Sequence, residues 1–155
     1  MGYQAESGPW RNFYLTGAKD LTRNEKPYTP VLTNYQTISQ MDTETLFDFC
    51  AIQINKNKAE GKEVVLNLHF SDTGEDASLI LKNSVLNHRL NRHEKDAPLD
   101  LTLSKKDFVS LFFGATNLKE LCQDQKASAN GCKETIDILT SCVETAHPNF
   151  NIVIP

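Results

Sequence analysis

The sequence predicts an α+β fold in which helices pack on an antiparallel sheet of five strands. Three observations favour this fold. A strongly apolar helical stretch follows Asp42, four strand-like stretches joined by short turns occupy residues 64–103, and helical periodicity returns after Ser104. Consecutive short strands with tight turns are typical of a β-meander, in which neighbouring strands run antiparallel. We therefore expect one core between the sheet and its helices.

Length and composition indicate one domain with appendages. The 155 residues are 39% hydrophobic and 23% charged, and the formal net charge of −4 makes a general affinity for nucleic acid unexpected. No stretch approaches the roughly 18 apolar residues of a membrane span. The first residues lack the basic and apolar regions of a secretory signal. The compartment, periplasmic or cytoplasmic, stays open.

Residues 1–21 differ in composition from the rest of the chain. All four tyrosines and the only tryptophan lie within the first 35 residues. Trp10, Phe13 and Tyr14 stand at i, i+3 and i+4, which is one face of a helix, and Gly17 is expected to end that helix after about two turns. So short a helix needs its aromatic face packed on something. The partner is either the domain that follows or a preceding domain.

Residues 22–40 show no apolar period and contain Pro27 and Pro30. Such a stretch predicts an extended linker. The domain proper is then expected to span residues 41–155. A compositional change on either side of a spacer is typical of two pieces with different roles.

The domain is expected to begin with a helix and continue with the sheet. Asp42 is predicted to cap a helix that runs to Ile54 and is apolar on most of its circumference. Alternation of apolar and polar residues then predicts strands at 64–70, 77–81, 85–90 and 99–103.

Helices are expected to return after the fourth strand. Ser104 opens a capping box with the acidic residue three positions on, and Gly114 is expected to end that helix. Thr116 is expected to cap a second short helix. Residues 125–131 predict a turn and a fifth, edge strand, and a last helix is expected to continue until His147.

The sequence offers no catalytic or metal-binding residues. The four histidines form no ligand motif and the four cysteines form no Cys-x-x-Cys pair. Phosphate-binding loops and nucleophile elbows are absent as well. We interpret His69 and His88 as surface or hydrogen-bonded strand residues and Cys50 as a small core residue. The basic cluster at 88–95 is either a solvated strand end or a contact for an anionic group.

Large apolar side chains are more numerous than one sheet face obviously needs. They either fill a plain core or line a cleft between sheet and helices that takes an apolar chain. Each methylene moved from water would favour binding by about 0.8 kcal/mol before the costs of association. The expected lining consists of Phe49, Ile52, Leu66, Leu68, Phe70, Phe108, Leu111, Phe112 and Leu121.

Several stretches resemble the C-terminal domain of the bacterial alkyl sulfatases, a family within the metallo-β-lactamase superfamily of zinc hydrolases. In the domain they are 47–55 (FDFCAIQIN), 58–62 (KAEGK), 67–76 (NLHFSDTGED), 85–89 (VLNHR), 101–104 (LTLS) and 150–153 (FNIV). Residues 2–18 (GYQAESGPWRNFYLTGA) are similar to the stretch that leaves the preceding dimerisation region. The order of helix, meander and helices also resembles the sterol carrier protein type 2 fold.

By that resemblance, the parent enzyme hydrolyses linear alkyl sulfate esters to alcohol and sulfate, using zinc to activate water. The family's zinc ligands lie upstream, so no catalytic or metal position is carried over to this chain. Residues 1–21 would be the end of the preceding region, and Trp10, Phe13 and Tyr14 would dock on that absent part. The implied partners are an aliphatic chain (alkyl sulfate, fatty alcohol or fatty acid) and the rest of the parent enzyme, with a dimer possible.

Three roles remain open on the sequence alone. The module binds the alkyl chain for an attached hydrolase, it is a separate lipid carrier, or it is purely structural and fills its own cleft. Two stretches depart from the family pattern, at 122–130 and 146–149. Both would lie where the last strand and the tail close the cleft.

Overall fold

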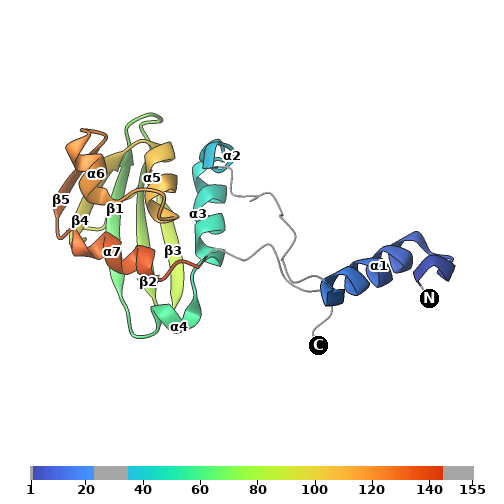
Figure 1. Ribbon diagram of the computed structural model, residues 1–155. Coiled ribbons are helices and arrows are strands. Elements are labelled where there is room, and N and C mark those ends of the chain that lie inside the picture. Colours follow the sequence, from blue (N-terminus) through green and yellow to red (C-terminus); the bar gives the residue numbers. More distant parts are fainter. Residues whose placement is uncertain (1, 23–34, 145–155) are drawn as a thin grey trace. The chain divides into compact units, whose positions relative to one another are not determined.

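The computed structural model describes residues 2–22 and 35–144, and these form two separate units (Figure 1). The first unit is helical. The second contains the sheet and the other helices. The expected spacer between 23 and 34 and the tail from 145 onward lie outside the described residues. No helix among the described residues is long and apolar enough to cross a membrane.

The first unit consists of a short 3-10 helix, η1 (Gly2–Gln4), and helix α1 (Gly8–Thr22). The amide of Arg11 donates to the carbonyl of Ser7 at 2.9 Å, which begins the helical hydrogen bonds. The expected end at Gly17 is wrong, because α1 has 15 residues and continues five positions further. A glycine costs a helix only about 1 kcal/mol relative to alanine, and the alanine, lysine and leucine that follow support the helix.

The second unit contains one five-stranded sheet with strand order β3-β2-β1-β4-β5. Its strands are β1 (Val64–Phe70), β2 (Asp76–Lys82), β3 (Val85–Leu90), β4 (Leu99–Leu103) and β5 (Ala127–Gly131). The first three form the expected antiparallel meander, and β5 pairs antiparallel with β4 at the edge. The α+β class and the five strands are therefore confirmed.

The expectation of a purely antiparallel sheet is wrong, because β4 runs parallel to β1. After β3 the chain crosses back through residues 91–98 and pairs with the other edge of β1. To run parallel to β1, the chain must return along the full length of the strands before β4 begins. An extended segment of eight residues, at roughly 3.3 Å for each residue, is long enough for this return. The Asn67 side chain holds this crossing, since Nδ2 donates to the Glu94 carbonyl at 3.0 Å and Oδ1 accepts from the Glu94 amide at 2.8 Å.

Six helices in the second unit are described, and the longer ones lie over one face of the sheet (Figure 1). Helix α3 packs against β3, α7 against β1 and α2 against α5. The bounds are α2 (Tyr35–Ser39), α3 (Thr43–Ile52), α4 (Lys56–Ala59), α5 (Lys105–Phe112), α6 (Leu118–Gln123) and α7 (Glu134–Ser141).

Capping explains most helix ends. The Asp42 side chain accepts from the Thr45 amide at 2.9 Å, and the Ser104 hydroxyl accepts from the Asp107 amide at 3.1 Å, as expected. Gly114, with φ of +74°, follows α5 in a conformation that favours glycine. The expectation that Thr116 caps α6 is wrong. The N-cap is Asn117, whose side chain accepts from a backbone amide in the first turn of the helix.

Three further expected boundaries differ from the structure. Helix α3 ends at Ile52 rather than at Ile54. The linker expected at 22–40 contains α2, whose Ile38 is buried and whose Tyr35 ring lies 6.1 Å from the Phe113 ring, so residues 35–40 belong to the second unit. The last helix ends at Ser141, not at His147, because Val143 instead forms an antiparallel bridge with Ile54. The last two differences come from contacts between residues far apart in the sequence.

Candidate functional site

The residues expected to line an apolar cleft lie mostly inside the packed core. Seven of the nine are at most 4% exposed: Leu66, Leu68, Phe70, Phe108, Leu111, Phe112 and Leu121. Phe49 is half-buried at the edge of the core. Ile52 is 75% exposed and points away from the interior, which corrects its expected position. The structure thus brings together most of the expected lining but not Ile52.

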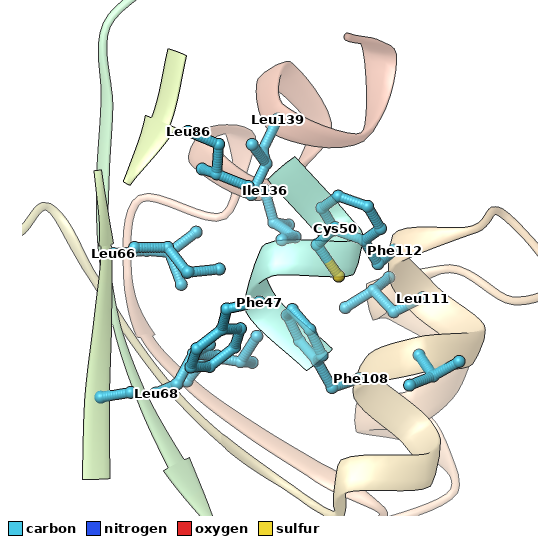
Figure 2. Packing of buried hydrophobic residues seen from close by; sticks show 14 of the residues in the cluster. Phe47, Cys50, Leu66, Leu68, Leu86, Phe108, Leu111, Phe112, Ile136 and Leu139 are labelled. Carbon is cyan, nitrogen blue, oxygen red and sulfur yellow. The ribbon is translucent and has the colours of Figure 1, made fainter. Parts of the chain in front are cut away.

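Aromatic rings fill the space between the sheet and the helices. Figure 2 shows Phe47 from α3 and Phe108 from α5 directed toward the strand residues Leu66 and Leu68. The Phe47 ring centroid lies 5.9 Å from that of Phe108 and 6.0 Å from that of Phe70. These separations are typical of rings in direct contact. The region expected as a possible cleft is therefore occupied by side chains.

Phe47 is a central core residue that the expected lining left out. It is 1% exposed and contacts the rings of Phe70, Phe108 and His88. Its burial together with Leu46 and Cys50 follows the i, i+3/i+4 spacing of a buried helix stripe. The helical spacing in the sequence therefore already indicated that Phe47 is buried.

Burial also raises the pKa of the Cys50 thiol far above its ordinary value, so this thiol stays protonated.

An apolar hollow does exist, but on the surface between α5 and α7. Its volume is about 320 Å³, within the roughly 300–1,000 Å³ range of small-molecule sites. Phe112 is the last residue of α5 and Phe113 is its C-cap. Gly114 turns the chain, and Val143 follows α7. The full lining is Phe112, Phe113, Gly114, Asp137, Thr140, Ser141 and Val143. We call this the α5–α7 hollow.

Local sequence explains how the hollow forms. The αL conformation of Gly114 stops α5 at the aromatic pair, so Phe112 enters the core while Phe113 remains half-buried. The rings of Phe112 and Phe113 meet edge to face at 5.3 Å. Phe113 also contacts Phe49 and Tyr35, with ring separations of 5.9 and 6.1 Å. These contacts fix one wall of the hollow in place.

Two other described hollows are polar. One of about 580 Å³ is lined by Gln36, Thr37, Ser39, Gln40, Asp72 and Lys106. The other, of about 310 Å³, lies between α5 and α6, and carboxylates from Asp107, Glu120 and Asp124 line it. Neither presents an aromatic ring. Size alone would favour the first, but its lining does not suit an apolar ligand.

A lysine–glutamate pair ties three elements together near the start of α5. Lys105, whose side chain is 8% exposed, places Nζ 3.2 Å from Glu75 Oε2 and 5.7 Å from the centre of the Phe70 ring. The hydroxyls of Thr43 and Thr73 donate to the same carboxylate at 2.6 and 2.8 Å. These hydrogen bonds, with Lys105, lower the pKa of Glu75. The arrangement is a structural clamp between the β1–β2 turn, α3 and α5.

Of the two strand histidines expected at the surface or in hydrogen bonds, His69 is hydrogen-bonded, whereas His88 packs on a core ring. His69 Nδ1 lies 2.7 Å from Asp76 Oδ1, and His93 Nε2 lies 3.3 Å from the same oxygen. His88 packs against the Phe47 ring and lies 3.9 Å from Asp48. Within residues 2–22 and 35–144, no three His, Cys, Asp or Glu side chains are arranged to hold a metal ion. The basic cluster at 88–95 is partly neutralised, because Arg89 and Arg92 both pair with Glu94.

The aromatic face of α1 is exposed. Trp10 is 67%, Phe13 55% and Tyr14 49% exposed, and Leu21 on the same helix is 60% exposed. Four large apolar side chains on one short helix are more than scattered surface residues require. This face has the properties of a contact surface.

Comparison with known proteins gives the family. The family model described as alkyl sulfatase C-terminal matches residues 32–155. A linear primary-alkylsulfatase from a Pseudomonas species is 35% identical over 156 residues, covering all of this chain and 23% of the relative. An alkyl/aryl-sulfatase from Saccharomyces cerevisiae is 30% identical over 155 residues, covering all of this chain and 24% of the relative. This chain therefore spans about a quarter of the length of the curated relatives that it matches.

Solved structures agree with the family. The stereoselective inverting sec-alkylsulfatase from a Pseudomonas species superposes with a TM-score of 0.83 at 26% identity, covering 97% of this chain and 24% of that chain. Sterol carrier protein 2 from Yarrowia lipolytica matches 64% of this chain and 91% of its own, with 26% identity and a TM-score of 0.47. At that score the second match supports no functional argument. Since the family model covers most of its residues, this chain belongs to the alkyl sulfatase C-terminal family.

Proposed function

We propose that this chain is the C-terminal module of an enzyme that hydrolyses alkyl sulfate esters, and that it binds the aliphatic chain in the α5–α7 hollow. Support for the enzyme comes from relatives of 30–35% identity that are named as alkylsulfatases and match this chain along its full length. Support for the ligand comes from the hollow itself. Its half-buried Phe113 and Val143 offer apolar surface beside the filled core.

Hydrolysis is assigned to the rest of the parent enzyme. The resemblance implies zinc in an upstream catalytic region, and the described residues do not fit a zinc site because no three ligand side chains converge. No reaction step is therefore placed on this chain. Its contribution is binding, since a module that holds the alkyl chain raises the local concentration of ester near an attached catalytic site.

The energetics favour a weak, general chain binder. Burying each methylene contributes about 0.8 kcal/mol, and association and chain ordering offset much of that gain. A hollow of about 320 Å³ that is open to solvent covers only part of a long chain. We therefore expect affinity in the micromolar range or weaker and little selectivity for chain length.

A second candidate function is structural, and the filled core favours it. Phe47, Phe70 and Phe108 occupy the interior where a deep cleft was considered. In this alternative, the module stabilises the parent enzyme and binds no chain. The exposed face of Trp10, Phe13 and Tyr14 serves either candidate, because we propose that it docks on the rest of the parent.

Ligand titration separates the two candidates. Dodecyl sulfate at tens of micromolar, below its micelle-forming range, is expected to raise the melting temperature of the chain and to shift NMR signals of Phe113, Gly114 and Val143. The variant Thr140→Phe fills the hollow from α7 and is expected to abolish both effects. Ile138→Phe is the matched control, because Ile138 lies on the same helix outside the lining and is already 40% exposed.

Each result decides between the candidates. Shifts confined to the hollow and lost only in Thr140→Phe support chain binding. An unchanged or lowered melting temperature in the wild-type chain favours the structural role. Sulfate release from dodecyl sulfate by this chain with added zinc would contradict the assignment of hydrolysis to the rest of the parent.

A further inference from the structure

Two lysines lie at the end of α7 that borders the α5–α7 hollow. Lys62 Nζ donates to Ser141 Oγ at 3.1 Å and lies 3.7 Å from Cys142 Sγ. Lys58 Nζ donates to the carbonyl of Val143 at 3.5 Å. Ser141 and Val143 are both lining residues of the hollow. Neither lysine belongs to the described lining, but each ammonium group is hydrogen-bonded to a residue that does.

These ammonium groups have no carboxylate partner among the residues that the structure describes. Every ion pair found within 4.0 Å in residues 2–22 and 35–144 involves other lysines, arginines or histidines. The nearby Glu144 carboxylate accepts instead from the side-chain Nδ2 of Asn55. Asp137 is the one carboxylate in the described lining, and it is one turn before Ser141 on α7.

One role of the lysines is already visible. The last carbonyls of a helix carry partial negative charge, and basic side chains near them stabilise the helix. That role does not use all the hydrogen-bond donors of each lysine, because an ammonium group carries three donors on a flexible four-carbon stem. An ammonium bonded to Ser141 or to the Val143 carbonyl can therefore donate to a further acceptor from outside the protein.

We infer that Lys58 and Lys62 select the headgroup at this site, so that the hollow takes a linear alkyl sulfate in preference to the uncharged alcohol. The inference rests on the proposed chain binding. The alkyl chain lies against Phe112, Phe113 and Val143, and the sulfate group lies at the two ammonium groups. Loss of the sulfate on hydrolysis removes the charged contact, so the product alcohol binds less tightly than the ester.

The expected size of the preference follows from the access of both lysines to solvent, since Lys58 is exposed and Lys62 is half-buried. An exposed ion pair contributes about 0.2–1 kcal/mol, which is a factor of roughly 1.4 to 5 for each lysine. Two lysines together therefore favour the ester over the alcohol by roughly two- to twenty-five-fold. Salt screens exposed charges, so the preference falls as ionic strength rises.

The experiment compares decyl sulfate with 1-decanol on the whole chain. Affinities are measured by NMR titration of the hollow residues for the wild type, for Lys58→Gln/Lys62→Gln and for Lys56→Gln. The double variant is expected to weaken binding of decyl sulfate by the same factor, roughly two- to twenty-five-fold, and to leave the affinity for 1-decanol within about twofold. Lys56 is the matched control, because it lies on α4 beside Lys58 but, among the described residues, it is Lys58 and Lys62 that hydrogen-bond to the hollow's lining. Loss of Lys56 should change neither affinity.

The possible outcomes separate the inference from the function on which it rests. If neither ligand shifts the hollow residues of the wild type, both chain binding and the inference are wrong. If both ligands bind with equal affinity, or if the double variant weakens them equally, chain binding stands and the headgroup inference is overturned. Raising the salt concentration on the wild type alone gives the same distinction, because screening should lower the affinity for decyl sulfate but not for 1-decanol. This measurement needs no variant to fold.

Discussion

Aromatic residues at helical spacing have opposite surroundings in two regions of the molecule. In α1, Trp10 and Tyr14 stand four apart and are 67% and 49% exposed. In α5, Phe108 and Phe112 also stand four apart and are 0% and 1% exposed. Spacing thus indicates which side chains share a face but not what covers that face. The α5 face is covered by this chain's own sheet and α3, whereas we propose that the rest of the parent enzyme covers the α1 face.

The largest expected effect tests this contrast directly. Phe108→Ala should lower the free energy of unfolding by about 3–5 kcal/mol, because it removes a fully buried ring and leaves a cavity among the rings of Phe47, Phe70 and Phe112. Trp10→Ala should change the free energy by no more than about 0.5 kcal/mol. Urea unfolding followed by circular dichroism measures both. A loss for Trp10→Ala as large as that for Phe108→Ala would mean that this chain itself covers the α1 face.

A smaller effect is expected at the lysine–glutamate clamp beside the core. Glu75→Gln should lower the free energy of unfolding at neutral pH by about 1–2 kcal/mol, because a partly exposed carboxylate loses charge-assisted hydrogen bonds from Thr43, Thr73 and Lys105. Thermal unfolding measured against pH gives the control. If the charge of Glu75 is unimportant, the free energies of unfolding of the wild type and of Glu75→Gln should differ by the same amount at all pH values.

The direction of the pH dependence follows from the lowered pKa of Glu75. Stability from a carboxylate whose pKa is lowered by folding is fully present above its unfolded pKa, about 4.3 for glutamate. That stability is lost as the pH falls through the lower pKa of the folded state. The gap between wild type and Glu75→Gln should therefore narrow on acidification. A gap that widens at low pH would contradict the role given to this carboxylate.

Much of the fold could be predicted from local patterns. The alternation of apolar residues gave the first four strands, Asp42 and Ser104 gave the starts of α3 and α5, and Gly114 gave the end of α5. These features depend on residues within a few positions of each other. The strand at 127–131 was also indicated, because Asn130-Gly131 is a turn signal at its end.

The features that were missed depend on contacts between distant residues. The parallel pairing of β1 and β4 requires the chain to cross the sheet, and the hydrogen bonds between Asn67 and Glu94 that hold this crossing join residues 27 apart. For a related reason, the sequence could not decide whether the interior is a filled core or contains a cleft. Phe70 and Phe108 would occupy the same sequence positions whether they lined a cleft or touched each other. The packing of the folded chain places their ring centroids 5.7 Å apart.

The smallest expected effect concerns Ile52, the expected cleft residue that the structure leaves exposed. Leu46 lies on the same helix and is 0% exposed, whereas Ile52 is 75% exposed. Leu46→Ala should therefore lower the free energy of unfolding by about 2–5 kcal/mol, while Ile52→Gln should change it by no more than about 0.5 kcal/mol. Ile52→Gln should also leave the NMR response to dodecyl sulfate unchanged, since Ile52 is not part of the described lining of the α5–α7 hollow. A weaker response would extend the ligand contact from the hollow onto α3, where Phe49 is half-buried and already touches the Phe113 ring.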